Sequence, residues 1–315
     1  MKYFLYPLVI ISLLSCQQEE SKCDKIVSII LENSLHKHEI DAEQLKEICN
    51  CDCEEDEFIE KILTLNNEPH TFYVRNGEFI YGSYSSDKSN TTGCYFTRPN
   101  IPDRVGYIKL EPLMIDINLS EEKTIDITSR YVRNIQKKIQ EEDKSELDAW
   151  LIDCSDNTGG NMWPMLVALE PFYDQNILGH FELDQDTVTW RAEDGDIYYD
   201  DFNFTQKCCP TCKPYQLKND VKIALLVSDR TGSSGEATAI SLQSLDKTSV
   251  FGCQTSGFAS GNSAFPIVKN EHLLLTTSIM TNDENISFPN GIPPDYRCTN
   301  SKELEQVLEE WLVKI

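Results

Sequence analysis

The sequence predicts an α/β protein in which strands separated by helices form a mixed or parallel sheet. Two observations support this fold class. From Gly106 onward, strand-like segments alternate with segments of helical length. Two of the strands are apolar enough to be buried, and each runs into a turn of small residues and then a helix. With 315 residues, 40% of them hydrophobic, the chain can bury a substantial core as one large domain or two small ones.

The elements follow from composition and periodicity. The predicted strands are 107–110, 149–152, 221–227, 249–252, 264–268 and 273–277, and the predicted helices are 121–140, 161–173, 236–245 and 302–312. Before them, apolar residues at helical spacings between Asp24 and Cys49 predict one or two amphipathic helices. We therefore expect an N-terminal helical region (24–66) and a main domain (67–315). The acidic, aromatic stretch 184–214 interrupts the alternation and is predicted to be a cysteine-containing insertion or lid.

The charge of the chain excludes some classes of partner. Lys and Arg number 28 against 52 Asp and Glu, which gives a formal net charge of -24. A nucleic acid backbone requires clustered cations, so nucleic acid is not an expected partner. For the same reason we expect no polybasic attachment to anionic lipid.

The first residues predict export. A short charged start precedes the apolar run Tyr3–Leu14, which is too short to span a membrane comfortably. The sequence Leu13-Leu14-Ser15-Cys16 resembles a bacterial lipobox, so residues 1–15 are predicted to be a signal peptide and Cys16 the lipidated first residue of a tether over 16–23. The alternative is an ordinary signal peptide with an incidental cysteine. We expect a protein of the bacterial cell envelope, lipid-anchored to a membrane and either periplasmic or surface-exposed.

Cysteines are unusually frequent, at 12, and form two clusters. Cys49-Asn-Cys51-Asp-Cys53 alternates, which disfavours pairing within the cluster, so its counterpart is predicted to be Cys208-Cys209-Pro-Thr-Cys212. Thiolates from both could bind zinc, but an exported protein favours disulfides. The prediction therefore includes no metal and no cofactor.

Two strand-to-helix junctions carry the candidate chemistry. In the first, Asp153-Cys-Ser-Asp-Asn-Thr-Gly159-Gly160 follows a buried strand, and paired glycines can expose N–H groups to an oxyanion. The glycines could also serve only a tight turn. In the second, Thr-Gly-Ser233-Ser234-Gly-Glu236 follows another buried strand. A serine there can act as a nucleophile, or Ser233 and Glu236 can form a capping box.

Together the junctions resemble a known family. The two motifs, followed by Phe251-Gly-Cys-Gln-Thr-Ser-Gly257 and Gly291-Ile-Pro-Pro-Asp295, are similar to the carboxy-terminal processing peptidases, the serine peptidases that include the tail-specific and tricorn proteases. The resemblance runs from about residue 68 to the C-terminus. It implies a Clp protease–crotonase-like β/α spiral core and peptide-bond hydrolysis. Ser233 matches the nucleophile, and the N–H groups of Gly159 or Gly160 and of Ser234 match the oxyanion hole.

The general base is predicted from a position at which this chain differs from the tail-specific relatives. Tail-specific relatives use a lysine where this chain has Phe258, whereas tricorn-like relatives use an early histidine, which Glu68-Pro-His70-Thr-Phe resembles. His70 is therefore the predicted base, because imidazole titrates near neutrality. A second departure is Ser155, where the family usually carries arginine. The orienting acid stays open among Glu236, Glu284 and Asp295.

The sequence thus predicts an exported, lipid-anchored serine peptidase acting on a peptide or protein substrate through Ser233 and His70. Too little chain lies between His70 and Gly106 for the peptide-binding PDZ module of tail-specific proteases. The first alternative is a catalytically degenerate lipoprotein of the same fold that binds peptides or glycans, which the departures at Ser155 and Phe258 motivate. The second is a cysteine-cluster metal protein. The distance from Ser233 to His70 discriminates the peptidase from the binding protein.

Overall fold

The computed structural model describes residues 21–83, 93–173 and 176–314. The predicted signal peptide and Cys16 lie outside these ranges. The helices are α1 (Lys22–Asn33), α2 (Ala42–Ile48), α3 (Glu55–Asn66), α4 (Glu121–Glu142), α5 (Met162–Ala168), α6 (Phe204–Cys208), α7 (Ser234–Gln243) and α8 (Ser301–Leu312). None of the helices in the described ranges is both long and apolar enough to cross a membrane.

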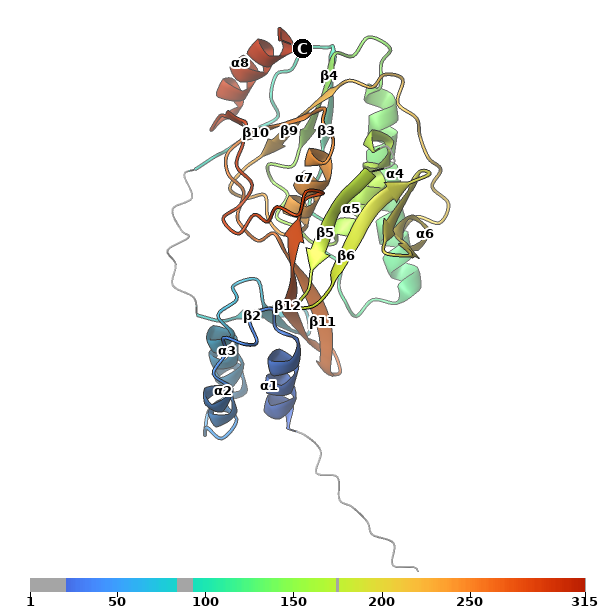
Figure 1. Cartoon of the computed structure of the whole chain (residues 1–315). Coiled ribbons are helices and arrows are strands. Elements are labelled where there is room, and N and C mark those ends of the chain that lie inside the picture. The colour runs from blue at the N-terminus through green and yellow to red at the C-terminus, as the bar shows by residue number, and fades with distance from the viewer. Residues whose placement is uncertain (1–20, 84–92, 174–175, 315) are drawn as a thin grey trace, which may run out of the picture.

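A five-stranded parallel sheet forms the centre of the main domain, as the alternation of elements predicts. Its strand order is β13-β10-β9-β4-β3. The strands are β3 (Val105–Lys109), β4 (Ala149–Asp153), β9 (Lys222–Val227), β10 (Thr248–Gly252) and β13 (Tyr296–Arg297). Helices α4, α5 and α7 cover one face and α8 the other (Figure 1).

Side-chain alternation explains why the central strands read as continuous apolar runs. In β4, Trp150 and Ile152 pack with α4 and α5, whereas Ala149 and Leu151 point to the opposite face and pack with α8. Because successive side chains of a strand alternate between faces, a strand covered on both sides must be apolar at every position.

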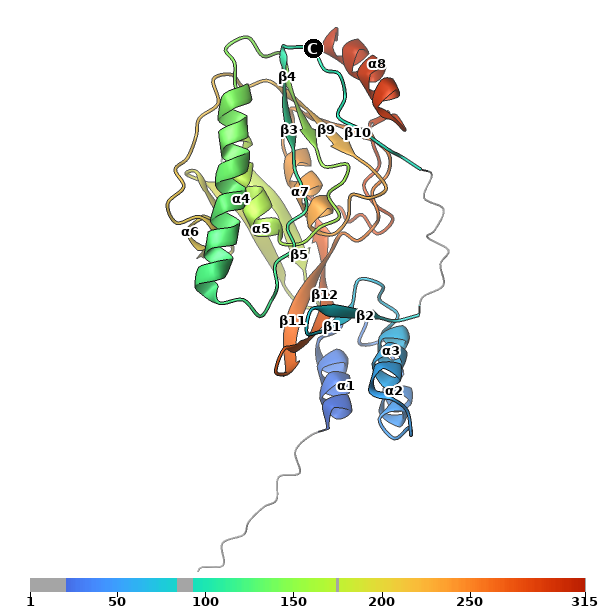
Figure 2. The ribbon, with the colours of Figure 1, turned by 180° about the vertical axis from the view of Figure 1, so that it is seen from behind.

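The second sheet is antiparallel and, within the described residues, has eight strands. Its order is β2-β1-β12-β5-β6-β7-β8, with β11 paired to β12. The strands are β1 (Phe72–Arg75), β2 (Glu78–Tyr81), β5 (Asn176–Glu182), β6 (Thr187–Glu193), β7 (Asp196–Tyr199), β8 (Phe202–Asn203), β11 (Ser260–Val268) and β12 (Glu271–Thr281). The N-terminal helices α1–α3 lie at one end of the molecule, against the part of this sheet formed by β1, β2, β11 and β12 (Figures 1 and 2).

The stretch 184–214 is not a lid. It forms β6, β7, β8 and α6, and its side chains Trp190 and Ile197 are fully buried in the largest hydrophobic cluster. The polar and aromatic composition that suggested a lid reflects short antiparallel strands with one exposed face. The helix expected over 161–173 is also shorter, because α5 ends at Ala168 and a short 3₁₀ helix follows at Glu170–Phe172.

The predicted pairing between the two cysteine clusters is wrong. The disulfides are Cys23–Cys49, Cys51–Cys53, Cys94–Cys253 and Cys209–Cys212. Each cluster thus pairs within itself or with a near neighbour, because the first lies on the N-terminal helices and the second beside α6. Only Cys208 of the two clusters is left as a thiol, so they do not form a joint zinc site.

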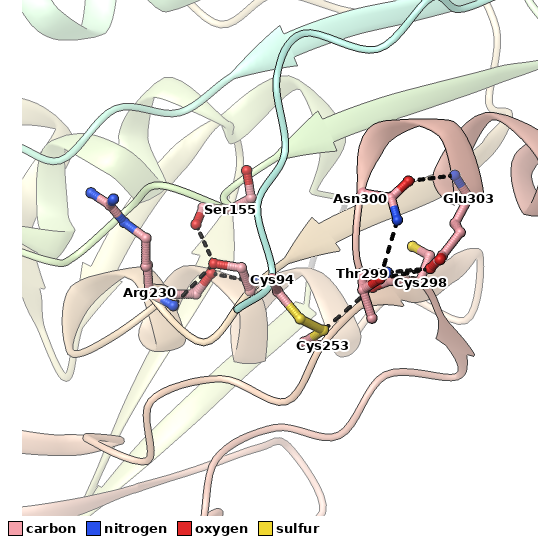
Figure 3. Close-up of a disulfide and its surroundings, with 10 residues drawn as sticks. Cys94, Ser155, Arg230, Cys253, Cys298, Thr299, Asn300 and Glu303 are labelled. Atoms are coloured by element: carbon pink, nitrogen blue, oxygen red, sulfur yellow. Dashed lines mark hydrogen bonds between the residues drawn. A yellow bond between two sulfur atoms is a disulfide. The ribbon is translucent and has the colours of Figure 1, made fainter. Parts of the chain in front are cut away.

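The Cys94–Cys253 disulfide joins the segment before β3 to the end of β10 (Figure 3). The Cys253 sulfur lies 3.3 Å from the backbone oxygen of Cys298, the residue that follows β13. Cys298 itself is a buried thiol. This disulfide therefore fixes the start of the segment 254–259, which leads from the parallel sheet to the second sheet.

Loop length predicts that the disulfides contribute unequally to stability. Cys94–Cys253 closes a sequence separation of 159 residues, against 3 for Cys209–Cys212. The chain-entropy relation gives about 5 kcal/mol for the long loop and about 2 kcal/mol for the short one. We expect the Cys94→Ala/Cys253→Ala variant to lose more free energy of unfolding than Cys209→Ala/Cys212→Ala, measured by guanidinium titration. Equal losses would contradict this ranking.

Candidate active site

The two strand-to-helix turns meet at one edge of the parallel sheet. β4 and β9 are adjacent parallel strands, so the turns that follow them begin side by side. Hydrogen bonds join the turns: Thr231 Oγ1 donates to the Cys154 oxygen at 2.8 Å, the Gly232 N–H to the Asn157 oxygen at 3.1 Å, and Ser234 Oγ to the Gly160 oxygen at 2.6 Å. The two predicted motifs therefore form one site.

Ser233 occupies a conformation that side chains rarely adopt. Its φ is 53° and its ψ is -118°, at the residue preceding α7. A serine on such a strained strand-to-helix turn projects its hydroxyl away from the helix, which is also the conformation of the nucleophilic serine in α/β-hydrolases. Gly159 makes room for it, because a Cβ at Gly159, whose φ is +113°, would lie 2.9 Å from the Ser233 Cβ.

His70 reaches Ser233 from the second sheet. It lies just before β1, and the Asn262 side chain on β11 donates to its backbone oxygen at 2.8 Å. The His70 Nε2 lies 3.0 Å from Ser233 Oγ. The separation that discriminates the two sequence-based hypotheses is thus a hydrogen-bond distance, although the two residues are 163 positions apart in the sequence.

The other ring nitrogen of His70 contacts a hydroxyl group. Its Nδ1 lies 2.8 Å from Ser260 Oγ, at the start of β11. With the imidazole proton on Nδ1, the ring donates to Ser260 and leaves Nε2 free to accept from Ser233. Burial lowers the pKa of His70 from 6.5 to about 4, because enclosure disfavours the charged imidazolium. The ring is therefore neutral at pH 7.

The three carboxylates considered as orienting acids do not hold His70, since both of its nitrogens are paired with hydroxyl groups. Glu236 instead accepts from the Ser233 N–H at 3.2 Å, from Thr255 Oγ1 at 2.5 Å, and from the N–H groups of residues 257 and 258 at 2.9 and 2.7 Å. Burial raises the pKa of this carboxyl group, and these four hydrogen bonds oppose that shift. Asp295 accepts from the Val250 N–H, and Glu284 is exposed.

The backbone N–H groups predicted to form the oxyanion hole differ in whether they already donate a hydrogen bond within the protein. The Gly159 N–H donates to the Asn157 side chain at 3.1 Å, so it is already paired. Within the described residues, no acceptor is recorded for the N–H of Gly160 or of Ser234. The Gly159 oxygen accepts from the Leu113 N–H, and because a trans peptide directs its two polar groups oppositely, the Gly160 N–H points away from Leu113.

Glycine is also required at position 160. Its φ is +116°, and a Cβ there would lie 2.2 Å from the Leu113 oxygen. Leu113 and Gly160 form a parallel bridge, in which the Asn161 N–H donates to the Leu113 oxygen at 2.8 Å. The segment around Leu113 thus fixes the peptide plane that carries the Gly160 N–H.

The two departures from the family pattern have structural explanations. The Phe258 ring, at the position where tail-specific relatives carry lysine, packs against His70 with ring centroids 5.5 Å apart. Ser155 is buried, and its hydroxyl donates to Asp153 Oδ1 at 2.6 Å. Its backbone oxygen accepts from the Ser228 hydroxyl. Neither change removes a group from the Ser233–His70 pair.

Sequence reasoning missed Ser260 and Asn262, the two β11 residues that contact His70. Both follow the Phe251–Gly257 element closely, but a serine and an asparagine at a strand start carry no chemical signature. Only the pairing of β11 with β12, and of β12 with β1, brings them to His70. Across the described ranges, no group of three or more His, Cys, Asp or Glu side chains is arranged to hold a metal ion.

Comparison with known proteins gives the relatives of this chain. It is 24% identical over 161 residues to a nisin-resistance protein of Lactococcus lactis subsp. lactis, an alignment that spans 50% of this chain and 49% of that protein. A lipoprotein from Streptococcus agalactiae superposes with a TM-score of 0.68 at 18% identity, covering 99% of both chains.

A putative peptidase from Parabacteroides merdae superposes with a TM-score of 0.57 at 12% identity, covering 93% of this chain and 95% of that one. These superpositions confirm the predicted α/β fold over nearly the whole described chain. Residues 104–298 match peptidase family S41, the family of carboxy-terminal processing peptidases that the sequence motifs indicated. This protein belongs to peptidase family S41.

Proposed function

We propose that this protein is a serine peptidase in which Ser233 is the nucleophile and His70 the general base. The observation that carries the proposal is the 3.0 Å distance between Ser233 Oγ and His70 Nε2. Two features support it: the neutral state of the buried imidazole at pH 7, and the strained backbone that presents the hydroxyl. The departures at Phe258 and Ser155, which motivated the alternative of a protein that only binds peptides or glycans, leave this pair of side chains intact.

The geometry supports the following reaction in this proposal. His70 Nε2 takes the proton of the Ser233 hydroxyl as Oγ attacks the peptide carbonyl carbon. The negative charge that develops on the carbonyl oxygen faces the N–H groups of Gly160 and Ser234, at the positive end of α7. His70 then gives the proton to the leaving amine, and water hydrolyses the acyl-enzyme by the same steps in reverse roles. No metal or cofactor enters these steps.

Ser260 takes the place of an orienting acid in this proposal. A neutral hydroxyl holds the Nδ1–H tautomer but stabilises the imidazolium less than a carboxylate would. Together with the low pKa of His70, this predicts an enzyme with a weaker base than an aspartate-assisted histidine.

The substrate and location are proposed from the sequence and the relatives. A peptide or protein is the substrate class of the family. The nisin-resistance protein and the Streptococcus agalactiae lipoprotein support a place in the cell envelope, with Cys16 carrying the lipid.

Removing the nucleophile tests the proposal directly. We expect Ser233→Ala to lower kcat by at least about 10⁴-fold, because the residual rate comes only from substrate binding and oxyanion contacts. Hydrolysis of a fluorogenic peptide pool and labelling by a fluorophosphonate probe are the measurements. Ser263→Ala, on exposed β11 sequence, is the matched control and should keep both. Unchanged labelling of the Ser233→Ala protein would overturn the assignment.

The hydrogen bond between Ser260 and His70 can be tested by substitution. We expect Ser260→Ala to lower kcat about tenfold with little change in KM, because the variant loses one hydrogen bond that orients the base. Ser260→Thr, which keeps a hydroxyl group, should restore most of the loss. Steady-state kinetics with one peptide substrate measure both. If the threonine variant is as impaired as the alanine variant while both remain folded, the hydroxyl does not position His70.

The low pKa of His70 predicts an unusual pH profile. Because the base must be neutral, kcat/KM should stay level as the pH falls through 6.5 and decline below about 4. Over the same range the unfolded chain binds a proton that the folded chain resists, so stability decreases as the pH falls from 6.5 toward 4. Kinetics and urea unfolding from pH 3.5 to 8 test both. An activity midpoint near 6.5 would contradict the buried, neutral base.

A further inference from the structure

Four neighbouring strands beside His70 form a sheet with two different faces. In the order β2-β1-β12-β11, the residues Ile80, Tyr73, Leu273 and Phe265 lie opposite one another as one cross-strand row. This row packs into the hydrophobic cluster of the N-terminal helices α1–α3. One face of the four strands is therefore covered by the protein itself.

The opposite face is apolar but is not covered in this way. Its two cross-strand rows are Tyr81–Phe72–Leu274–Ala264 and Phe79–Val74–His272–Pro266. Within the described ranges, no member of either row belongs to a buried hydrophobic cluster or packs against one. The Phe79 and Tyr81 side chains are 47% and 51% exposed.

The aromatic rings on this face contact one another. The Phe72 ring lies 5.6 Å from that of Phe79 and 5.5 Å from that of Tyr81, and Phe79 and Tyr81 stack at 6.4 Å between centroids. Rings held by their neighbours lose little conformational freedom when a ligand covers them. This cluster, Phe72, Phe79 and Tyr81, is called the aromatic face below.

The aromatic face continues directly from the site. Phe72 is the first residue of β1 and lies two residues after His70, which stands in the turn that precedes this strand. Thr276 and Asn262 are paired across β12 and β11, in the row next to Leu274 and Ala264 and on the same side of the sheet. Asn262 holds the backbone of His70. The side of the sheet that carries the aromatic face is therefore the side that contacts His70.

We propose that the aromatic face binds apolar side chains of the peptide substrate that lie near the bond that is cut. The inference rests on the proposed function and specifies its substrate class. An apolar surface of this kind, adjoining a nucleophile and base, gains free energy when apolar side chains displace water from it. A lipid surface is disfavoured as the occupant, because the net charge of -24 repels anionic membranes.

Paired peptides test the inference. Two otherwise identical peptides carry Leu-Phe or Ser-Ser near the cleaved bond, and their binding to the Ser233→Ala protein is measured by fluorescence anisotropy. We expect the apolar peptide to bind at least about tenfold more tightly. Adding Phe79→Ser and Tyr81→Ser should reduce this preference to about twofold or less. Phe202→Ser is the matched control, since Phe202 is 51% exposed on β8 at the other end of the sheet, and should keep the preference.

A second variant guards against a folding defect. Ala264→Asp places a charge in the row of Phe72 at an exposed position and should abolish the same preference, with the unfolding midpoint of each variant measured alongside. An unchanged preference for the apolar peptide in the folded variants would overturn the inference. It would also be overturned if the variants lost only binding to zwitterionic vesicles, or only self-association, and kept the preference for the apolar peptide.

The two proposals fail differently. If the parent protein hydrolyses no peptide but the Ser233→Ala protein keeps the preference, the peptidase assignment fails and the aromatic face stands as a peptide-binding surface. If hydrolysis depends on Ser233 but the preference for the apolar peptide is unchanged when Phe79 and Tyr81 are replaced, the peptidase assignment stands and this inference fails.

Discussion

The hydrogen bonds between the two strand-to-helix turns determine most of the geometry described here. They join the turn after β4 to the turn after β9, so the positions of the two glycines and of Ser233 depend on one another. The strained φ of Ser233 persists because its N–H is held by Glu236 and its Cβ fits against Gly159. Backbone strain of this kind survives only where the surrounding contacts determine the conformation more than once.

The sequence was informative where chemistry and local pattern coincide. The buried strands β4 and β9, the turns that follow them and the helices after the turns could all be predicted, because apolar runs, glycine pairs and helical periodicity are local signals. The capping box and the candidate nucleophile, offered as alternatives, are both compatible with the structure: Glu236 binds the backbone of Ser233 while the Ser233 hydroxyl contacts His70.

What the sequence could not predict depends on pairing between distant strands. Ser260 reaches His70 only because β11, β12 and β1 lie side by side, and nothing near Ser260 indicates that register. The disulfides show the same limit, since Cys94 and Cys253 are joined across most of the main domain and the clustered cysteines pair locally instead. Of the two alternatives for the stretch 184–214, the lid was suggested because short half-exposed strands have a composition similar to that of a loop.

His70 and Ser233 are positioned by different sheets, so contact between their side chains requires both sheets. The turn that carries Ser233 follows β9 of the parallel sheet, whereas His70 is placed by the pairing of β1 with β12 and by the N-terminal helices that pack on those strands. Closing so long a stretch of chain is slow relative to local folding. The Ser233–His70 hydrogen bond can therefore form only where both sheets are in place, so its presence reports the completed tertiary structure and not the folding of either sheet alone.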